Sequence, residues 1–300
     1  MDSDDLKTFI AVHRSGGFSH AAASLGRSQP AISRRIALLE DELRLPLFER
    51  VPGRAMLSQA GRLLLPYAER VLAALQDAEQ ALRALATEEA GPVSLAVVGT
   101  LAGTDLGAAL KLFAESHPKV DLRLRTASSN DVSDLVRVGD VEIGLRYILD
   151  PSEDLECEEI GAERLIVACA KRHRWAGRSI ARLAQLRAEK WLAFPVVAGR
   201  REIAASHIFA LFLAHGLGEV DWTPVDSLTA QKRLVEAGFG IALLPESSVS
   251  EELSREAMSA IRVGDLTASR PIVAVTRRGG YLSLAGKRLV ELLRERYAAS

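Results

Sequence analysis

The polar residues in the stretch 28–35 have the types and spacing of side chains that contact duplex DNA. On a helix, Gln29, Ser33 and Arg34 would face outward with Arg35 beside them, while the apolar residues of the stretch would face inward. Amide, hydroxyl and guanidinium groups of this kind hydrogen-bond base edges and phosphates. The pattern therefore predicts a helix whose outer face can enter a major groove.

The elements that would position this helix lie in residues 18–39, which are typical of two short helices joined by a tight turn. Ser19 is predicted to cap the first helix, and Gly26 to end it in a left-handed conformation. Ser28 is predicted to cap the second helix, with Pro30 in its first turn. This is the pattern of a helix-turn-helix, whose second helix reads DNA. Helix pairs of this kind also occur in proteins that never contact DNA, so a purely structural role stays open.

Composition places the chain among ordinary globular proteins. The 300 residues suggest about two domains, and the net charge of −1 gives no global basic excess. Residues 26–62 nevertheless carry seven arginines and four acidic residues, a local balance of +3. The acidic start resembles no secretory signal, and no apolar run is long enough to span a membrane. We therefore expect a cytoplasmic protein.

Two further features follow the second helix. Residues 50–57 are predicted to form a turn between two short strands, a wing in which Arg50 and Arg54 could reach phosphate or the minor groove. A solvated loop with two arginines is the alternative. Residues 58–87 are predicted to form one long helix. Its apolar residues follow an a/d pattern, which favours a partner helix and hence a dimer. They are Leu64, Ala68, Val71, Leu75, Ala78, Leu82 and Leu85.

Several short motifs occur in one order along the first 61 residues. They are Leu6-x-x-Phe9, Ser19-x-Ala21-Ala22, Ser28-Gln29-Pro30-Ala31-Ile32-Ser33, Leu39-Glu40, Leu47-Phe48-x-Arg50 and Ser58-x-Ala60-Gly61. Followed by a long helix, they resemble the LysR-type transcriptional regulators. The resemblance implies that Gln29, Pro30, Ser33 and Arg34 face promoter DNA and that the long helix pairs two winged domains. It also implies a homodimer or homotetramer, and makes RNA polymerase a candidate partner.

From residue 91 onward, predicted strands and helices alternate, which favours βαβ units and a parallel sheet covered on both faces. This half resembles the family's effector domain, a two-lobed α/β structure like periplasmic binding proteins, with crossings expected near residues 165–168 and 266–271. The expected fold is therefore α+β and multidomain. We expect a winged helix-turn-helix over 1–57, a linker helix over 58–90 and an effector domain over 91–300. Lobe I would take about 91–164 and 267–300, and lobe II about 165–266.

Ligands of open parallel sheets bind beyond the carboxyl ends of the strands, often at helix N-termini. This rule predicts an effector site whose hydroxyls, helix N-termini and one arginine favour a small anion such as a carboxylate. Helix capping and an ion pair of Arg146 with Asp150 or Glu153 are the structural alternatives. The candidate residues are Thr100, Leu101, Ser128, Ser129, Arg146, Val197, Ala198, Gly199 and Ser227.

Other chemistry has little support in the sequence. No Ser-His-Asp order, Gly-rich phosphate loop or metal-ligand cluster stands out, so we expect no enzyme, metal or cofactor. Cys157 and Cys169 could form a redox switch like that of peroxide-sensing relatives, although burial of Cys169 in a strand is the simpler interpretation. An effector-independent regulator, and a binding protein or enzyme built on the C-terminal half, remain alternatives.

Overall fold

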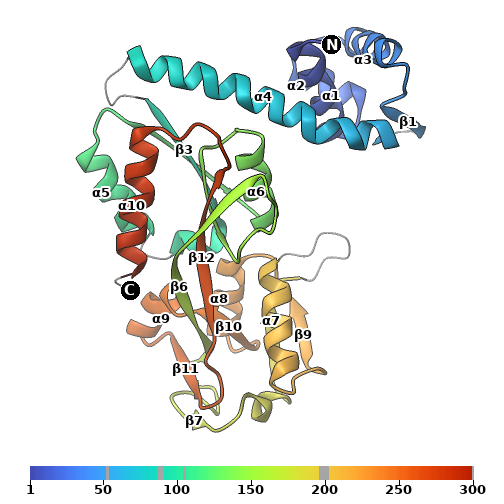
Figure 1. Cartoon of the computed structure of the whole chain (residues 1–300). Coiled ribbons are helices and arrows are strands. Elements are labelled where there is room, and N and C mark those ends of the chain that lie inside the picture. Colours follow the sequence, from blue (N-terminus) through green and yellow to red (C-terminus); the bar gives the residue numbers. More distant parts are fainter. Residues whose placement is uncertain (52–53, 87–90, 104–105, 196–202, 299–300) are drawn as a thin grey trace. The chain divides into compact units, whose positions relative to one another are not determined.

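The structure is a computed structural model that describes residues 1–51, 54–86, 91–103, 106–195 and 203–298 (Figure 1). Three helices, a two-stranded antiparallel hairpin and one long helix make up the N-terminal part. They are α1 (Ser3–Ser15), α2 (Phe18–Ser24), α3 (Gln29–Leu43), β1 (Phe48–Val51), β2 (Arg54–Leu57) and α4 (Gln59–Ala86). The predicted helix-turn-helix, wing strands and long helix are all present.

The predicted helix caps are only partly correct. Helix α2 begins at Phe18 after Gly17, so Ser19 lies inside the helix and does not cap it. Gly26 follows the end of α2 with φ 62°, the left-handed conformation that glycine adopts without strain. Ser28 occupies the N-cap position of α3, but its side chain makes no capping hydrogen bond. The turn is therefore fixed by backbone conformation rather than by the two serine hydroxyls.

Helix α3 is held by an apolar core that its inward face shares with α1, α2 and the hairpin. Ile32, Ile36 and Leu39 of α3 are buried in this core. The ring of Phe48 at the start of β1 lies 5.5 Å from that of Phe9 in α1, measured between centroids. Because each fully buried aliphatic side chain contributes about 1.5–3 kcal/mol, this core fixes which face of α3 remains outside.

The C-terminal part contains two lobes. Lobe I has the strand order β4-β3-β5-β12-β6, in which β4, β3 and β5 are parallel and β12 is antiparallel to both neighbours. The parallel pairing predicted from the βαβ units is confirmed for β3, β4 and β5, whereas β12 makes the whole sheet mixed. Its elements are β3 (Pro92–Val98), η1 (Gly99–Gly103), α5 (Leu106–Ser116), β4 (Asp121–Ala127), α6 (Ser129–Arg137), β5 (Ile143–Tyr147), β6 (Leu155–Ala170), β12 (Ser269–Arg277) and α10 (Leu284–Ala298).

Helices cover both faces of the lobe I sheet, as predicted. Leu95 and Val97 of β3 pack with residues of α5 and α10, whereas Ala96 packs on the opposite face with residues of α6. This alternation is expected of a strand buried on both sides.

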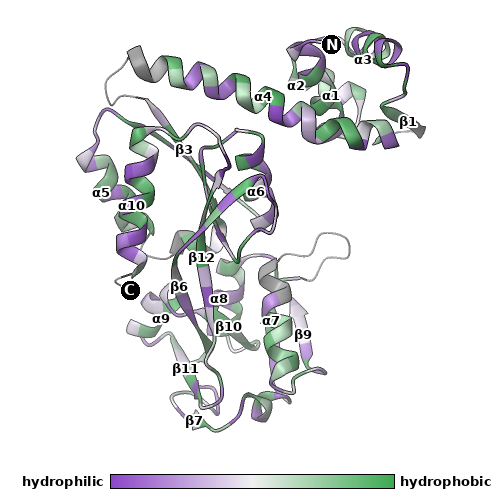
Figure 2. Ribbon diagram, viewed as in Figure 1, coloured by the Kyte–Doolittle hydropathy of each residue, from purple (hydrophilic) through white to green (hydrophobic). Residues whose placement is uncertain are grey.

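Lobe II is built on the strand order β6-β10-β8-β9, with β11 also paired to β6. Helix α7 is apolar on two sides, because Ile208 and Phe212 are buried while Phe209 and Leu213 are exposed, and it is green over most of its coloured length in Figure 2. The elements are β7 (Ser179–Ile180), η2 (Leu183–Leu186), β8 (Lys190–Ala193), α7 (Ile203–Ala214), β9 (Asp221–Pro224), α8 (Leu228–Glu236), β10 (Ile241–Pro245), η3 (Ser247–Val249), α9 (Ser250–Ser254) and β11 (Met258–Val263).

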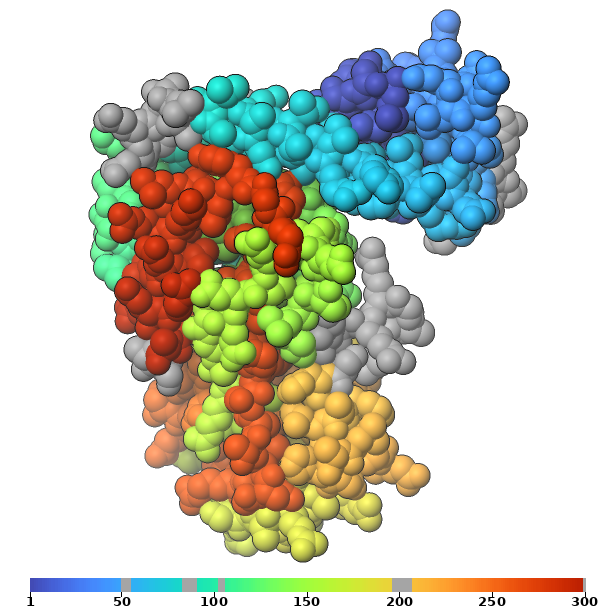
Figure 3. All heavy atoms as spheres, in the orientation of Figure 1, coloured from blue at the N-terminus to red at the C-terminus, as the bar shows by residue number. Residues whose placement is uncertain are grey.

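Two long strands, β6 and β12, connect the lobes. Residues 155–164 of β6 pair with β12, and residues 165–170 pair with β10 and β11 (Figure 1). On the face drawn in Figure 3, β12 runs beside β6. The change of partner between Arg164 and Leu165 agrees with the first crossing expected near 165–168.

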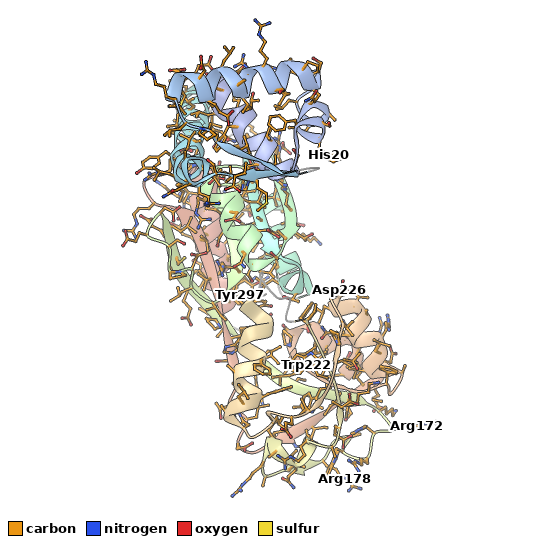
Figure 4. The ribbon with its side chains drawn as sticks, turned by 90° about the vertical axis from the view of Figure 1, so that its right-hand side faces the viewer. His20, Arg172, Arg178, Trp222, Asp226 and Tyr297 are labelled. Carbon is orange, nitrogen blue, oxygen red and sulfur yellow. The ribbon has the colours of Figure 1, made fainter. Side chains whose placement is uncertain are left out.

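Glycine permits close packing on this connection. A Cβ atom on Gly161 would lie 2.5 Å from Cβ of Tyr297, near the C-terminal end of α10 (Figure 4).

Two features are absent from the described residues. No helix among them is long and apolar enough to cross a membrane. No group of three or more His, Cys, Asp or Glu side chains there could hold a metal ion.

Candidate DNA interface and effector site

The outward face of α3 is free of contacts with the apolar core. Gln29, Pro30, Ser33 and Arg34 are exposed, as is Ser28 at the N-cap position. Their opposite neighbours on the helix are buried. The packing therefore presents an amide, a hydroxyl and a guanidinium on one accessible helix surface, which is the arrangement that major-groove reading requires.

Arg35 has a different environment from Arg34. Its guanidinium lies 3.1 Å from a carboxylate oxygen of Asp5 and 3.5 Å from one of Asp2. Asp4 lies 3.9 Å from the same group and pairs with Arg27 at 3.0 Å. The start of α1 thus partly neutralises two arginines beside the DNA-reading helix. A direct role of Arg35 on DNA stays a prediction.

The hairpin provides the predicted wing, with Arg50 opposite Ala55 and Val51 opposite Arg54. The backbones of Arg50 and Arg54 lie in β1 and β2, but their side chains are outside the described part of the structure. Their contact with DNA stays a prediction.

The long helix α4 corrects the start of the predicted dimer seam. Ala68 is fully buried in the core of its own domain, and Leu64 packs against that core. The apolar residues left exposed begin instead at Leu63 and Tyr67. Farther along the helix, Val71, Leu75 and Ala78 of the predicted seam are exposed, as is Leu82, while the Leu85 side chain lies outside the described residues.

The predicted effector residues of lobe I fall into two classes. Thr100 in η1 and Ser129 at the start of α6 are buried, and neither hydroxyl has a hydrogen-bond partner in the described part of the chain. Leu101 is fully buried, so its side chain packs in the lobe I core. Ser128 donates to Asp131 at 2.7 Å and accepts from its backbone N–H, as a helix-capping residue does.

Arg146 is buried, and its charge is already paired. Its guanidinium donates to Ser133 and lies 2.5 Å from Asp150. Burial alone would raise the pKa of Asp150, but hydrogen bonds from Ser152 and Ser133, together with the Arg146 charge, lower it to about 2. The ion pair that the sequence analysis left as an alternative is therefore present. Nη2 of Arg146 is buried without a hydrogen-bond partner among the described residues, so a direct contact of Arg146 with an anionic ligand stays a prediction.

On the lobe II side, Ser227 caps α8 by accepting a 3.3 Å hydrogen bond from the Ala230 N–H. Its neighbour Asp226 is exposed at the edge of lobe II (Figure 4). The remaining candidates Val197, Ala198 and Gly199 lie outside the described residues.

A disulfide between Cys157 and Cys169 of one chain is excluded. Both residues lie on the single strand β6, twelve positions apart, which corresponds to roughly 40 Å of extended chain. A disulfide requires Cα atoms about 4.4–6.8 Å apart. Burial also raises the pKa of the Cys169 thiol to about 11, which disfavours the reactive thiolate at neutral pH.

Both parts of the chain match families of known proteins. Residues 3–62 match the bacterial regulatory helix-turn-helix proteins of the lysR family, and residues 86–298 match the LysR substrate binding domain. The chain belongs to the LysR family of transcriptional regulators. As a LysR-family regulator, it binds promoter DNA through its N-terminal part and carries an effector-binding domain in its C-terminal part.

Similar LysR-family proteins cover almost the whole chain. The regulator CbbR of Rhodospirillum rubrum is 29% identical over 96% of this chain and 94% of its own length. CbbR of Xanthobacter flavus is 30% identical over 98% of this chain and 87% of its own. The solved structure of the LysR family regulator CbnR has a TM-score of 0.65 at 27% identity, covering 98% of this chain and 99% of that one. CbnR complexed with its target DNA matches with a TM-score of 0.59 at 26% identity, covering 99% of this chain and 100% of that one.

This LysR-family regulator also has a buried polar cluster where β6 and β12 connect the lobes, which the sequence analysis missed. The Tyr147 hydroxyl donates to one oxygen of Glu163 at 2.6 Å, and the Ser247 hydroxyl donates to the other at 2.9 Å. Arg270 lies directly opposite Glu163 in the strand pairing. The sequence signal for this cluster was a charged residue close to each of two apolar runs. Glu163 lies near the run 165–170, and Arg270 precedes the run 271–275. Their pairing depends on strand register, which the sequence analysis did not predict.

Proposed function

We propose that this LysR-family regulator reads its promoter with the exposed face of α3 and changes its DNA affinity when a small anionic effector binds between the lobes. The observation that carries the first part is the exposure of Gln29, Ser33 and Arg34 on a helix whose other face is fixed in an apolar core. Arg50 and Arg54 of the wing would add phosphate or minor-groove contacts.

Dimerisation belongs to the same proposal. The apolar stripe of α4 that includes Val71, Leu75 and Leu82 would pair with α4 of a second copy and set the spacing between two recognition helices. A homotetramer would contain two such pairs. In this proposal the regulator acts in the cytoplasm, has RNA polymerase as a candidate partner and performs no catalysis.

The effector would act through the strands that join the lobes. An anion bound by Thr100, Ser129 and the N-terminus of α6 on one side, and by residues 197–199 and Ser227 on the other, would favour a closed arrangement of the lobes. Because β6 runs through both lobes and β12 pairs with its lobe I half, closure would bend β6 and alter the packing between subunits. The effector and DNA would then affect one another's binding reciprocally.

The test of DNA reading is the variant Arg34→Ala on a promoter fragment upstream of the regulator's own gene. Loss of a base contact is expected to weaken specific binding by about 1–3 kcal/mol, which is roughly 5–150-fold in Kd. Arg172→Ala, which removes an exposed arginine of lobe II, is the matched control and should bind like the wild type. Equal affinities of the Arg34 variant and wild type would remove Arg34 from the interface.

A further inference from the structure

The segment 171–190 of lobe II is strongly basic in a chain that is nearly neutral as a whole. It carries seven Lys or Arg residues and one acidic residue, a balance of +6, whereas the net charge of the chain is −1. A local concentration of one sign attracts partners of the opposite sign and raises their rate of encounter. The basic residues are Lys171, Arg172, Arg174, Arg178, Arg182, Arg187 and Lys190.

The apolar residues of this segment fix which of its side chains face water. Ile180 in β7 and Leu183 in η2 are buried in the lobe II core. Arg178 and Arg182, which stand directly before these two short elements, are exposed. Atoms of the segment form the lower end of lobe II in Figure 3, and in Figure 4 Arg172 and Arg178 point away from the ribbon there. The core therefore holds the segment as a defined basic surface.

Most of the arginines on this surface have no carboxylate partner. Lys171 is paired with Glu256 at 2.5 Å, and Arg174 with Glu189 at 2.5 Å. The remaining guanidiniums are hydrated, and each can donate two parallel hydrogen bonds to a carboxylate. In the described part of the chain, no carboxylate pairs with Arg172, Arg178, Arg182 or Arg187.

An exposed aromatic ring lies at the end of the lobe II sheet where this segment begins. Phe239 is 48% exposed in the turn that precedes β10, and the Lys190 ammonium lies 3.8 Å from the centroid of its ring. The turn also approaches the end of β6, since a Cβ atom on Gly238 would lie 3.9 Å from Cβ of Ala170, which directly precedes Lys171. The ring is thus bordered by cations and offers a contact for an apolar side chain.

We propose that this basic surface binds an acidic segment of a partner protein, with Phe239 receiving one of its apolar side chains. The carboxylates of Glu189 and Glu256 are interspersed among the cations. A nucleic-acid backbone carries a negative charge at every nucleotide and would meet these carboxylates. A protein segment can instead place acidic side chains on the arginines and neutral ones beside the carboxylates. This inference goes beyond the proposed function, because neither α3 nor the region between the lobes takes part.

The test uses the full-length protein and a fluorescein-labelled peptide of about 12 residues, all glutamate except for one central phenylalanine. Binding is measured by fluorescence anisotropy at about 0.05 M and 0.2 M salt, because contacts between exposed charges weaken as salt rises. The wild type is expected to bind the peptide, with a larger Kd at the higher salt. A second peptide, with serine in place of phenylalanine, is expected to bind about threefold more weakly, since it loses a partly buried apolar side chain.

Two matched double variants test the charged contacts. Arg172→Gln combined with Arg178→Gln is expected to raise the Kd of the peptide roughly fivefold, because exposed ion pairs are individually weak and two are lost together. Lys119→Gln combined with Lys287→Gln removes the same charge from exposed positions of lobe I and should bind the peptide as the wild type does.

The variant Phe239→Ser tests the aromatic contact. It should weaken binding of the phenylalanine peptide about threefold and leave binding of the serine peptide unchanged. A surface that acts through charge alone would not show this coupling between the two side chains.

The proposal is overturned if the wild type does not bind the peptide, or if the arginine variant and the lobe I control lose the same affinity. Equal effects of Phe239→Ser on both peptides would also overturn it. A labelled DNA duplex of unrelated sequence completes the test. The arginine variant should bind this duplex as well as the lobe I control does, and weaker binding would assign the surface to nucleic acid and reject the acidic protein segment.

Discussion

Substituting Gly61 by alanine should weaken the packing of the start of α4 on the winged domain. Gly61 lies in the first turn of α4, and a Cβ atom there would lie 2.2 Å from the carbonyl oxygen of Leu47 and 2.9 Å from Cδ2 of Leu57. The first contact is with backbone, so a side-chain rotation cannot relieve it. The helix start must instead move by roughly 1 Å to restore an ordinary contact.

The expected cost can be assembled from this geometry. Overpacking of a well-packed site costs about 1–3 kcal/mol. Displacing the helix start also weakens the 2.9 Å hydrogen bond from Ser58 N–H to the Leu47 carbonyl, which contributes about 0.5–1.5 kcal/mol. Alanine offsets roughly 0.5–1 kcal/mol of this loss, because it stabilises a helix more than glycine does. The net expectation is a loss of about 1–3 kcal/mol in unfolding free energy.

Urea unfolding followed by two probes checks this expectation. The three tryptophans, at positions 175, 191 and 222, all lie in lobe II, whereas far-UV circular dichroism reports every helix. Gly61→Ala should shift an early part of the dichroism transition to lower urea while leaving the tryptophan transition in place.

Gly107→Ala is the matched control. Gly107 also lies near the start of a helix, α5, but a Cβ there would meet nothing within 4 Å. It should leave stability unchanged or raise it by up to about 1 kcal/mol. The packing argument would be refuted if Gly61→Ala were as stable as the wild type, or if both variants lost the same amount of stability.

Three further perturbations test other parts of the molecule. Leu75→Asp places a charge on the exposed stripe of α4 and should dissociate dimers in sedimentation velocity; unchanged oligomers would reject the seam. Asp4→Asn should loosen Arg27 and Arg35, tighten binding to non-cognate DNA and steepen the salt dependence of log K by about one; an unchanged slope would contradict this. Asp150→Asn should remove about 1–2 kcal/mol at neutral pH, a modest figure because the carboxyl is only partly shielded from water. The lowered folded-state pKa of Asp150 stabilises the fold above pH 4, and this contribution is lost as the pH falls from about 4 to 2. The stability of the Asp150→Asn variant should not fall in this way between about pH 4 and 2. Parallel curves of unfolding free energy against pH for wild type and variant would refute this expectation.

The sequence was sufficient for elements that local interactions define. The two helices around Gly26, the wing predicted over 50–57 and the helix capped by Ser58 were all predicted, since glycine conformation and apolar periodicity act within a few residues. Which face of α3 is exposed also followed from the spacing of Ile32, Ile36 and Leu39.

Predictions based on distant pairing were less accurate. The heptad pattern included Leu64 and Ala68, yet both pack within the chain, because a periodic stripe does not reveal which partner covers each turn. The effector residues were inferred from strand ends, but Leu101 packs in the lobe I core and Arg146 donates to Ser133 of α6. The 155–164 strand was missed because its alternating charged residues carry no continuous apolar signal.

By itself, the sequence determined the helix-turn-helix, its outward polar face and the succession of strands and helices, because these depend on contacts close along the chain. Only the tertiary structure decided that Arg146 is neutralised while Arg270 is buried without a close acceptor. Glu163 and Arg270 are separated by 107 positions and meet only when β6 and β12 pair. The availability of a charge depends on such long-range neighbours, which residue types alone do not specify.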